Sequence, residues 1–189
     1  MITDRKSFKE YLAADLAVAY VPKNPVKRFF NTLAGNEQCA AYKYVHRLRK
    51  AEYHLNTGHR LLYHWNHFFL TRLGLKYGIR IAPNKVGKGI NIIHLAGGGG
   101  CILNCLSIGD YCRVQSGVVI GNVGDDDHRP TIGNHVAFGL GCKVYGKITI
   151  GDNARILPNA VVTHDVPANA IVGGTPAKIL NIKKEDNTL

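Results

Sequence analysis

A repeat of six residues constrains this 189-residue chain more than any other feature. From residue 102 to residue 162, an aliphatic or aromatic residue recurs at every sixth position, with one interruption between residues 120 and 132. This first column consists of Ile102, Ile108, Val114, Ile120, Ile132, Phe138, Val144, Ile150, Ile156 and Val162. A second apolar column follows four positions later, at Leu106, Cys112, Val118, Val136, Cys142, Ile148, Ala154, Ala160 and Val166.

A period of six fits neither the 3.6-residue turn of an α-helix nor the period of two of a hairpin sheet. Short strands joined by tight turns satisfy it, because each group of six residues then forms one side of a triangular coil. Pairs such as Gly109-Asp110 and Gly133-Asn134 supply the unusual dihedral angles of such turns. We therefore predict a mainly β fold, a parallel β-solenoid whose first-column side chains point to the axis. The alternative is a β-sandwich with accidental spacing.

The N-terminal part of the chain has a helical rather than a six-residue pattern. Apolar periodicity predicts helices over residues 4–20, 24–35 and 36–55, and a fourth that ends near Gly74 or Gly78. The expected organisation is a small α-helical domain over residues 1–78, a β-helix domain over residues 79–180 and a flexible tail over residues 181–189.

The positive charge of the chain is concentrated in this helical part. Residues 1–89 hold 16 Lys and Arg against 5 Asp and Glu, whereas residues 90–189 hold 8 of each. Such a surface suits a polyanion or an anionic membrane, and a solvated helical face explains it equally well. No nucleic-acid-binding motif accompanies the charge, which argues against DNA or RNA as a partner.

Several features predict a cytoplasmic protein without a resident metal. No apolar run approaches the ~20 residues of a membrane span, and the charged start lacks the apolar segment of a signal peptide. The five cysteines form no Cys-x-x-Cys pair, and Cys112 and Cys142 fall in the second column, which predicts buried thiols. His64 and His67 could share a helix face, but no Cys or acidic ligand lies beside them.

Two breaks in the six-residue repeat hold the candidate functional residues. His94 precedes the glycine run from Gly97 to Gly100, whose backbone N–H groups could face a developing negative charge. The second break, from Gly124 to Pro130, is a charged loop leaving a rigid solenoid, which is a frequent location of function. The alternatives are a flexible glycine loop and a solvated turn.

Residues 79–180 resemble the hexapeptide-repeat acyltransferases, and among them the serine acetyltransferase group. The similarity is strongest over residues 108–121 and over residues 165–178, and the second stretch is similar to the closing signature of the family. The resemblance implies a left-handed parallel β-helix, a homotrimer with active sites between neighbouring coils, and acetyl-CoA as the donor. It leaves open whether the N-terminal helices join two trimers into a hexamer.

The resemblance also implies roles for individual residues. His94-Leu-Ala-Gly97 matches the setting of the family's catalytic histidine. Chemistry agrees, because a neutral imidazole can take the proton of a hydroxyl that attacks a thioester. His128 is the second catalytic candidate. The predicted substrate-binding residues are Asp127 and Arg129, which would bind the acceptor, and Gly97 and Gly98, whose N–H groups would bind the oxygen of the thioester carbonyl. The positions that fall where the family binds its donor are Gly121, Asn122, Gly139, Gly141, Pro158 and Lys178.

The chain departs from the serine acetyltransferase pattern on the acceptor side. Ile93 stands where that group places an aspartate that holds the amino acid, and a second aspartate, which orients the imidazole, falls near Arg80 or Ala82. These departures favour a sugar hydroxyl, as in surface-polysaccharide synthesis, slightly over L-serine as the acceptor. A lipid-linked glycan at an anionic membrane would then suit the basic helices. Two alternatives from other classes are a zinc-dependent, carbonic-anhydrase-like enzyme and a non-catalytic trimeric scaffold.

Overall fold

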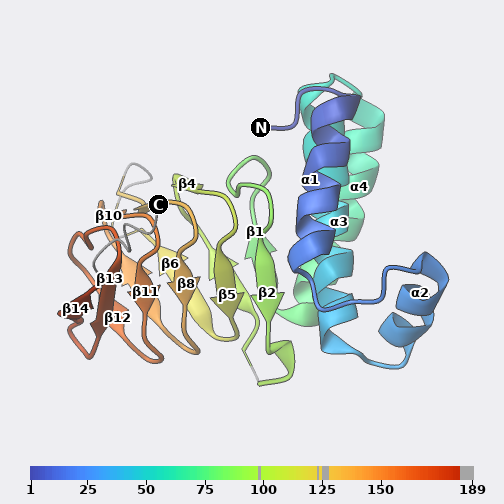
Figure 1. The fold of residues 1–189 in the computed structure, drawn as a ribbon. Coiled ribbons are helices and arrows are strands. Elements are labelled where there is room, and N and C mark those ends of the chain that lie inside the picture. The colour runs from blue at the N-terminus through green and yellow to red at the C-terminus, as the bar shows by residue number, and fades with distance from the viewer. Residues whose placement is uncertain (98, 123, 125–127, 184–189) are drawn as a thin grey trace, which may run out of the picture.

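The computed structural model describes residues 1–97, 99–122, 124 and 128–183, which form helices first and a solenoid of short strands after them (Figure 1). The helices of these residues are α1 (Arg5–Val18), α2 (Pro25–Leu33), α3 (Glu37–Asn56) and α4 (Arg60–Tyr77). The side chains of Asn24 and Asn36 cap α2 and α3 by accepting hydrogen bonds from first-turn amides. The predicted helices are confirmed.

The strands of the described residues form three sheets, which we name A, B and C. The strands are β1 (Ile79–Ile81), β2 (Asn91–Ile93), β3 (Cys101–Leu103), β4 (Ser107–Ile108), β5 (Arg113–Gln115), β6 (Val118–Gly121), β7 (Thr131–Ile132), β8 (Ala137–Phe138), β9 (Lys143–Tyr145), β10 (Thr149–Ile150), β11 (Arg155–Ile156), β12 (Val161–Val162), β13 (Ala170–Gly173) and β14 (Lys178–Ile182). Sheet A has the order β1-β3-β6-β9-β12, sheet B the order β10-β7-β4 and sheet C the order β14-β13-β11-β8-β5-β2.

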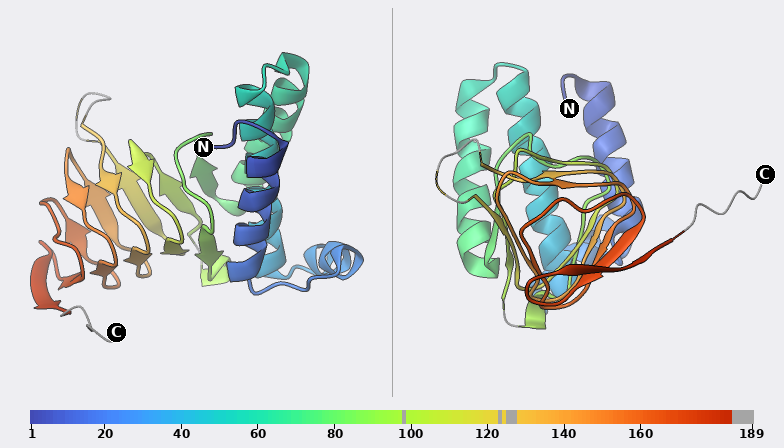
Figure 2. Two further views of the ribbon diagram at one scale, coloured as in Figure 1. Left: turned by 45° about the horizontal axis from the view of Figure 1, so that its top comes forward. Right: turned by 90° about the vertical axis from the view of Figure 1, so that its left-hand side faces the viewer.

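The chain visits the three sheets in turn, so each coil of the solenoid has three sides. All pairings are parallel except that of β13 with β14, which closes the C-terminal end. The view along the axis shows the triangular cross-section (Figure 2). The predicted solenoid is therefore confirmed. Of the predicted tail over residues 181–189, Asn181 and Ile182 belong to β14 and pair with β13, and residues 184–189 lie outside the described residues.

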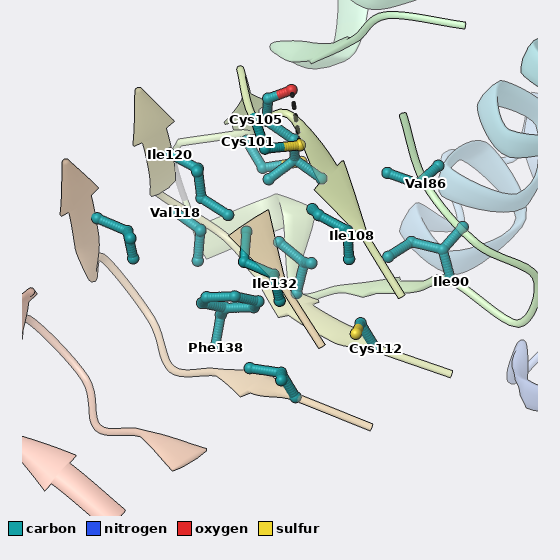
Figure 3. Packing of buried hydrophobic residues seen from close by; sticks show 14 of the residues in the cluster. Val86, Ile90, Cys101, Cys105, Ile108, Cys112, Val118, Ile120, Ile132 and Phe138 are labelled. Carbon is teal, nitrogen blue, oxygen red and sulfur yellow. Dashed lines mark hydrogen bonds between the residues drawn. The ribbon is translucent and has the colours of Figure 1, made fainter. Parts of the chain in front are cut away.

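The first-column residues from Ile108 onward fill the axis of the solenoid. Each of them is at most 3% exposed, and Figure 3 shows Ile108, Ile120, Ile132 and Phe138 meeting in the interior. In the second column, Cys112 and Cys142 are fully buried, which confirms the prediction for these thiols. Burial raises the pKa of both to about 12, so neither is a reactive thiolate at neutral pH.

The predicted phase is wrong at the start of both columns. Ile102 is 41% exposed and Leu106 is 38% exposed, whereas Leu103 and Cys105 are buried. Leu103 pairs with Ile120 only seventeen positions later, while regular coils such as that of Ile132 and Ile150 advance by eighteen. A shift of one residue turns every side chain of a strand to its other face. In this coil, which is one residue short, Leu103 therefore faces the axis and Ile102 faces solvent.

The helices α1, α3 and α4 stand side by side across the N-terminal end of the solenoid, and α2 projects from this layer on the side away from the strands (Figures 1 and 2). The Tyr44 hydroxyl of α3 accepts a hydrogen bond of 3.0 Å from the backbone N–H of Ile81 in β1. None of the helices in the described ranges is both long and apolar enough to cross a bilayer.

A buried charge network joins these helices to the first coil. Arg49 of α3 donates from Nε to Asp15 of α1 at 2.8 Å and from Nη1 to Glu52 at 2.9 Å. The same guanidinium donates to the carbonyl of Val86, and Asp15 accepts from the backbone N–H of Gly89 at 2.7 Å. The helical periodicity does not predict this network, because charged residues in an amphipathic helix are expected on its solvent-exposed face.

Acid is expected to destabilise the helical layer through His46 of α3. Burial, with smaller effects from Lys50 and Arg47, lowers the pKa of this histidine from 6.5 to about 4. The unfolded chain therefore binds more protons than the folded chain between these values, so the free energy of unfolding falls as the pH drops through this window. We expect a loss of about 2 kcal/mol, which is less than the full shift because the ring is partly exposed.

Urea denaturation at neutral pH and at about pH 4.5 measures this effect. His46→Gln should lose about 2 kcal/mol less than the wild type on acidification. His64→Gln, which changes an exposed histidine of α4, is the matched control and should behave like the wild type. An equal acid loss in wild type and His46→Gln would contradict the prediction.

Candidate active site

The corner between sheets B and C carries the predicted Gly-Asp and Gly-Asn pairs. The backbone N–H of Asp110 donates to the side-chain oxygen of Asn134 at 2.8 Å, and that of Asn134 donates to Asp152 at 2.7 Å. Each polar side chain thus caps the backbone of the preceding coil. These hydrogen bonds hold the coils together, so we assign the three side chains a structural role.

The corner between sheets C and A, which we call the glycine corner, is lined by Gly100, Gly117 and Gly141. All three have positive φ angles, between 43° and 73°. A Cβ atom on Gly117 would lie 3.2 Å from the Cα of Gly141, so the coils approach more closely here than side chains permit. The Gly117 N–H donates to the Gly100 carbonyl at 2.7 Å. Such a corner lets a ligand approach the backbone directly.

His94 lies at the start of the glycine corner, between β2 and the 3-10 turn η1 (Leu95–Gly97). Its side chain is exposed and its φ angle is 63°. Within the described chain, no hydrogen bond to its imidazole is formed. Ile93, which stands where the serine acetyltransferase group places an aspartate, is buried, and Arg80 and Ala82 are exposed. The imidazole is therefore accessible to a substrate, and no carboxylate of the described chain orients it.

The strand register places four of the predicted donor residues on the side of His94. Because Ile93 pairs with Gln115, His94 lies one coil above the turn of Ser116 and Gly117. Gly139 and Gly141 follow on the next coil and Pro158 on the one after it, roughly 14 Å from His94 at a spacing of about 4.8 Å per coil. Lys178 is exposed in β14, opposite Gly173 at the C-terminal end of the same corner.

The structure adds residues that the sequence analysis missed. Glu37, the first residue of α3, accepts a hydrogen bond of 2.6 Å from the backbone N–H of Ala96 and so holds the turn after His94. Lys143 donates to the Gly117 carbonyl at 2.6 Å. No sequence pattern could have revealed Glu37, since 59 residues separate it from its partner. Lys143 could have been found, because a residue beside an axis-facing valine must point outward.

One of the proposed oxyanion donors is already engaged. The Gly99 N–H donates to the side-chain oxygen of Ser116 at 3.1 Å. Gly97 ends the η1 turn, and Gly98 lies outside the described residues. The Gly99 N–H is therefore not free to bind an oxyanion in this structure, and the other N–H groups of the glycine run stay candidates for that role.

The other predicted residues that the structure describes, apart from the glycine run, lie at the corner between sheets A and B, which we call the loop corner. Gly121 ends β6, and Asn122, His128 and Arg129 belong to the segment between β6 and β7. Asn122 accepts a hydrogen bond of 3.1 Å from the Asn104 side chain, while His128 is exposed. Asp127 lies outside the described residues. A single chain therefore divides the predicted site between two corners and does not bring His94 and His128 together.

The known proteins similar to this chain in sequence and in structure include serine acetyltransferases. No family model matches the sequence. The serine acetyltransferase of Synechococcus elongatus is 40% identical over 106 residues, which are 54% of this chain and 43% of that protein. Serine acetyltransferase 2 of Arabidopsis thaliana is 30% identical over 158 residues, which are 82% of this chain and 46% of that protein. This chain is a relative of the serine acetyltransferases. It spans about half the length of these two proteins.

The solved structures confirm the fold. The crystal structure of serine acetyltransferase from Brucella abortus in complex with coenzyme A matches with a TM-score of 0.73 at 22% identity, covering 95% of this chain and 70% of that chain. The architecture is thus the hexapeptide-repeat left-handed β-helix, with helices in front of it. In the described part of the chain, no group of three or more His, Cys, Asp or Glu residues could hold a metal ion.

Proposed function

We propose that this chain is an acetyl-CoA-dependent O-acetyltransferase of the serine acetyltransferase type, with L-serine as its acceptor. The observation that carries the proposal is an exposed imidazole at the head of the glycine corner, in line with Gly139, Gly141, Pro158 and Lys178. The relatives are named for serine, and a neighbour of the same fold was solved with coenzyme A. The absence of an aspartate at Ile93 favoured a sugar hydroxyl as the acceptor, and the acceptor assay described below tests that alternative.

The proposed reaction uses His94 as a general base. Its imidazole takes the proton of the acceptor hydroxyl while the oxygen attacks the thioester carbonyl of acetyl-CoA. The tetrahedral intermediate carries a negative charge, for which N–H groups of the glycine run are the candidate donors. Collapse of the intermediate breaks the carbon–sulfur bond, and the imidazolium returns its proton to the departing thiolate. The products are an acetyl ester and free CoA.

The donor is proposed to lie along the glycine corner. Its long pantetheine arm needs a narrow path, and two residues without side chains, Gly117 and Gly141, follow each other on consecutive coils of this corner. The exposed ammonium group of Lys178, farther along the same corner, suits a phosphate of CoA.

The acceptor site is proposed to form between subunits of a homotrimer. His128 and Arg129 belong to the segment at the loop corner, whereas His94 belongs to the glycine corner. A loop corner of one subunit beside the glycine corner of the next would unite them. The same arrangement would bring Gly121 and Asn122 to the donor. The mass of the assembly in solution, measured by ultracentrifugation, tests the proposed homotrimer separately from the reaction.

The decisive experiment measures thiol release from acetyl-CoA with L-serine and with a panel of sugars and sugar nucleotides as acceptors. Serine-dependent turnover with an O-acetylserine product supports the proposal. Turnover with a sugar alone would keep the reaction and replace the acceptor. Failure to turn over any acceptor, together with no binding of CoA in calorimetry, would contradict the enzyme and favour a scaffold.

A further inference from the structure

The helix α2 exposes an apolar face that no other part of the described chain covers. Val26, Phe29, Phe30 and Leu33 occupy positions i, i+3, i+4 and i+7 of the helix, so they share one side of it. These four side chains are between 56% and 67% exposed, and no residue of α2 is buried. A cluster of large apolar side chains in contact with water indicates an interaction surface.

Although α2 projects from the helical layer, it is held firmly at its base (Figure 1). Arg28 donates to the backbone carbonyls of Pro22 and Lys23 at 2.8 and 2.7 Å, and its guanidinium lies 5.2 Å from the centre of the Tyr42 ring on α3. Asn24 caps the first turn. The basic residue thus anchors α2 to the layer, while the apolar face is left pointing outward.

The positive charge around the apolar face of α2 favours an anionic partner. The segment between Asp15 and Glu37 contains no acidic residue, and Lys23 and Lys27 are exposed without an ion pair to the described chain. The surrounding residues 1–89 carry a net charge of +11, from 16 basic and 5 acidic residues. A second copy presenting the same face would be repelled, whereas an anionic lipid surface would be attracted.

We propose that α2 docks on an anionic membrane surface. The side chains of Val26, Phe29, Phe30 and Leu33 enter the boundary between headgroups and acyl chains, and Lys23 and Lys27 meet anionic headgroups. This combination of an apolar stripe and flanking cations is the physical signature of an interfacial helix. Because α2 has only nine residues, its docking is reversible and sensitive to salt.

Docking through α2 would also bring the candidate site close to the bilayer. Leu33 at the end of α2 and Gly35 just after it line a cavity of about 530 Å³ together with Glu37, Gly99 and Gly100. The glycine corner therefore lies directly behind the docking helix. The proposal itself does not depend on the reaction, since it concerns the surface of α2 alone.

The test is sedimentation of the protein with vesicles of phosphatidylcholine, with and without phosphatidylglycerol, at low and high salt. We expect binding to the anionic vesicles at low salt to exceed binding to neutral vesicles about tenfold, and to fall at high salt. The double variant Phe29→Ser/Phe30→Ser should remain in the supernatant. Ile179→Ser/Ile182→Ser, which removes two exposed apolar side chains at the far end of the solenoid, should still sediment.

A fluorescent variant reports on the location of α2 directly. The chain has one tryptophan, Trp65 of α4, so Phe30→Trp in a Trp65→Phe background places the only indole on α2. Its emission should shift to the blue when anionic vesicles are added. Retention of the wild type in the supernatant at low salt, or an unshifted emission, would overturn the proposal. So would a lower assembly mass for Phe29→Ser/Phe30→Ser in ultracentrifugation, which would make the face a contact between copies.

Discussion

Replacing His94 by alanine is expected to lower kcat with acetyl-CoA and its acceptor by about 10²–10⁴-fold. The reason is that an alcohol is a weak nucleophile near neutral pH, and the variant lacks the imidazole that is proposed to take its proton. The KM for acetyl-CoA should change little, because the donor is proposed to lie along Gly117, Gly141 and Lys178 rather than on the imidazole. Steady-state kinetics with both substrates varied measures the two quantities separately.

His164→Ala is the matched control for this prediction. His164 is also exposed at a turn of the solenoid, where its Nδ1 lies 3.0 Å from the Thr163 hydroxyl, but it is outside the proposed site. The control should keep the wild-type kcat, and unchanged urea midpoints should show that both variants are folded. Full activity in His94→Ala would mean that another group is the base.

The six-residue repeat predicted the fold because each position has a physical consequence. A first-column residue must fill the axis, and a glycine followed by Asp or Asn must make a turn, as at Gly109 and Asp110. The predicted burial of Ile102 and Leu106 was wrong, because these two positions hold apolar residues although the coil before Ile108 is one residue short. Only the pairing of Leu103 with Ile120 reveals it.

The candidate site could be predicted only in part, for a similar reason. His94 and Gly141 belong to one corner, which the strand register reveals and the six-residue period alone does not. The contact of Glu37 with the turn after His94 depends on how α3 packs across the end of the solenoid. The sequence pattern describes each coil well, but it contains no information on which helix residue meets which coil.

Replacing Arg49 by alanine is expected to lower the free energy of unfolding by about 3–5 kcal/mol. The guanidinium is fully buried between Asp15 and Glu52, and it also donates to the carbonyl of Val86 in the first coil. Removing it leaves two buried carboxylates without their cation and removes the hydrogen bond from α3 to the Val86 carbonyl of the solenoid. Arg72→Ala on α4 removes an exposed arginine over the Phe68 ring and should cost about 0.5 kcal/mol.

The pH dependence separates the loss of charge compensation from a simple loss of packing. Burial already raises the pKa of Glu52, even though Arg49 opposes the effect, so removing Arg49 should raise it further. A carboxyl whose pKa is raised by folding contributes stability at low pH and loses it as the pH rises through the folded-state value. The deficit of Arg49→Ala relative to the wild type should therefore be larger at pH 8 than at pH 5, as measured by urea denaturation. A deficit of the same size at both values would show that the guanidinium acts as a spacer and hydrogen-bond donor, and that its charge contributes nothing to holding the helices on the solenoid.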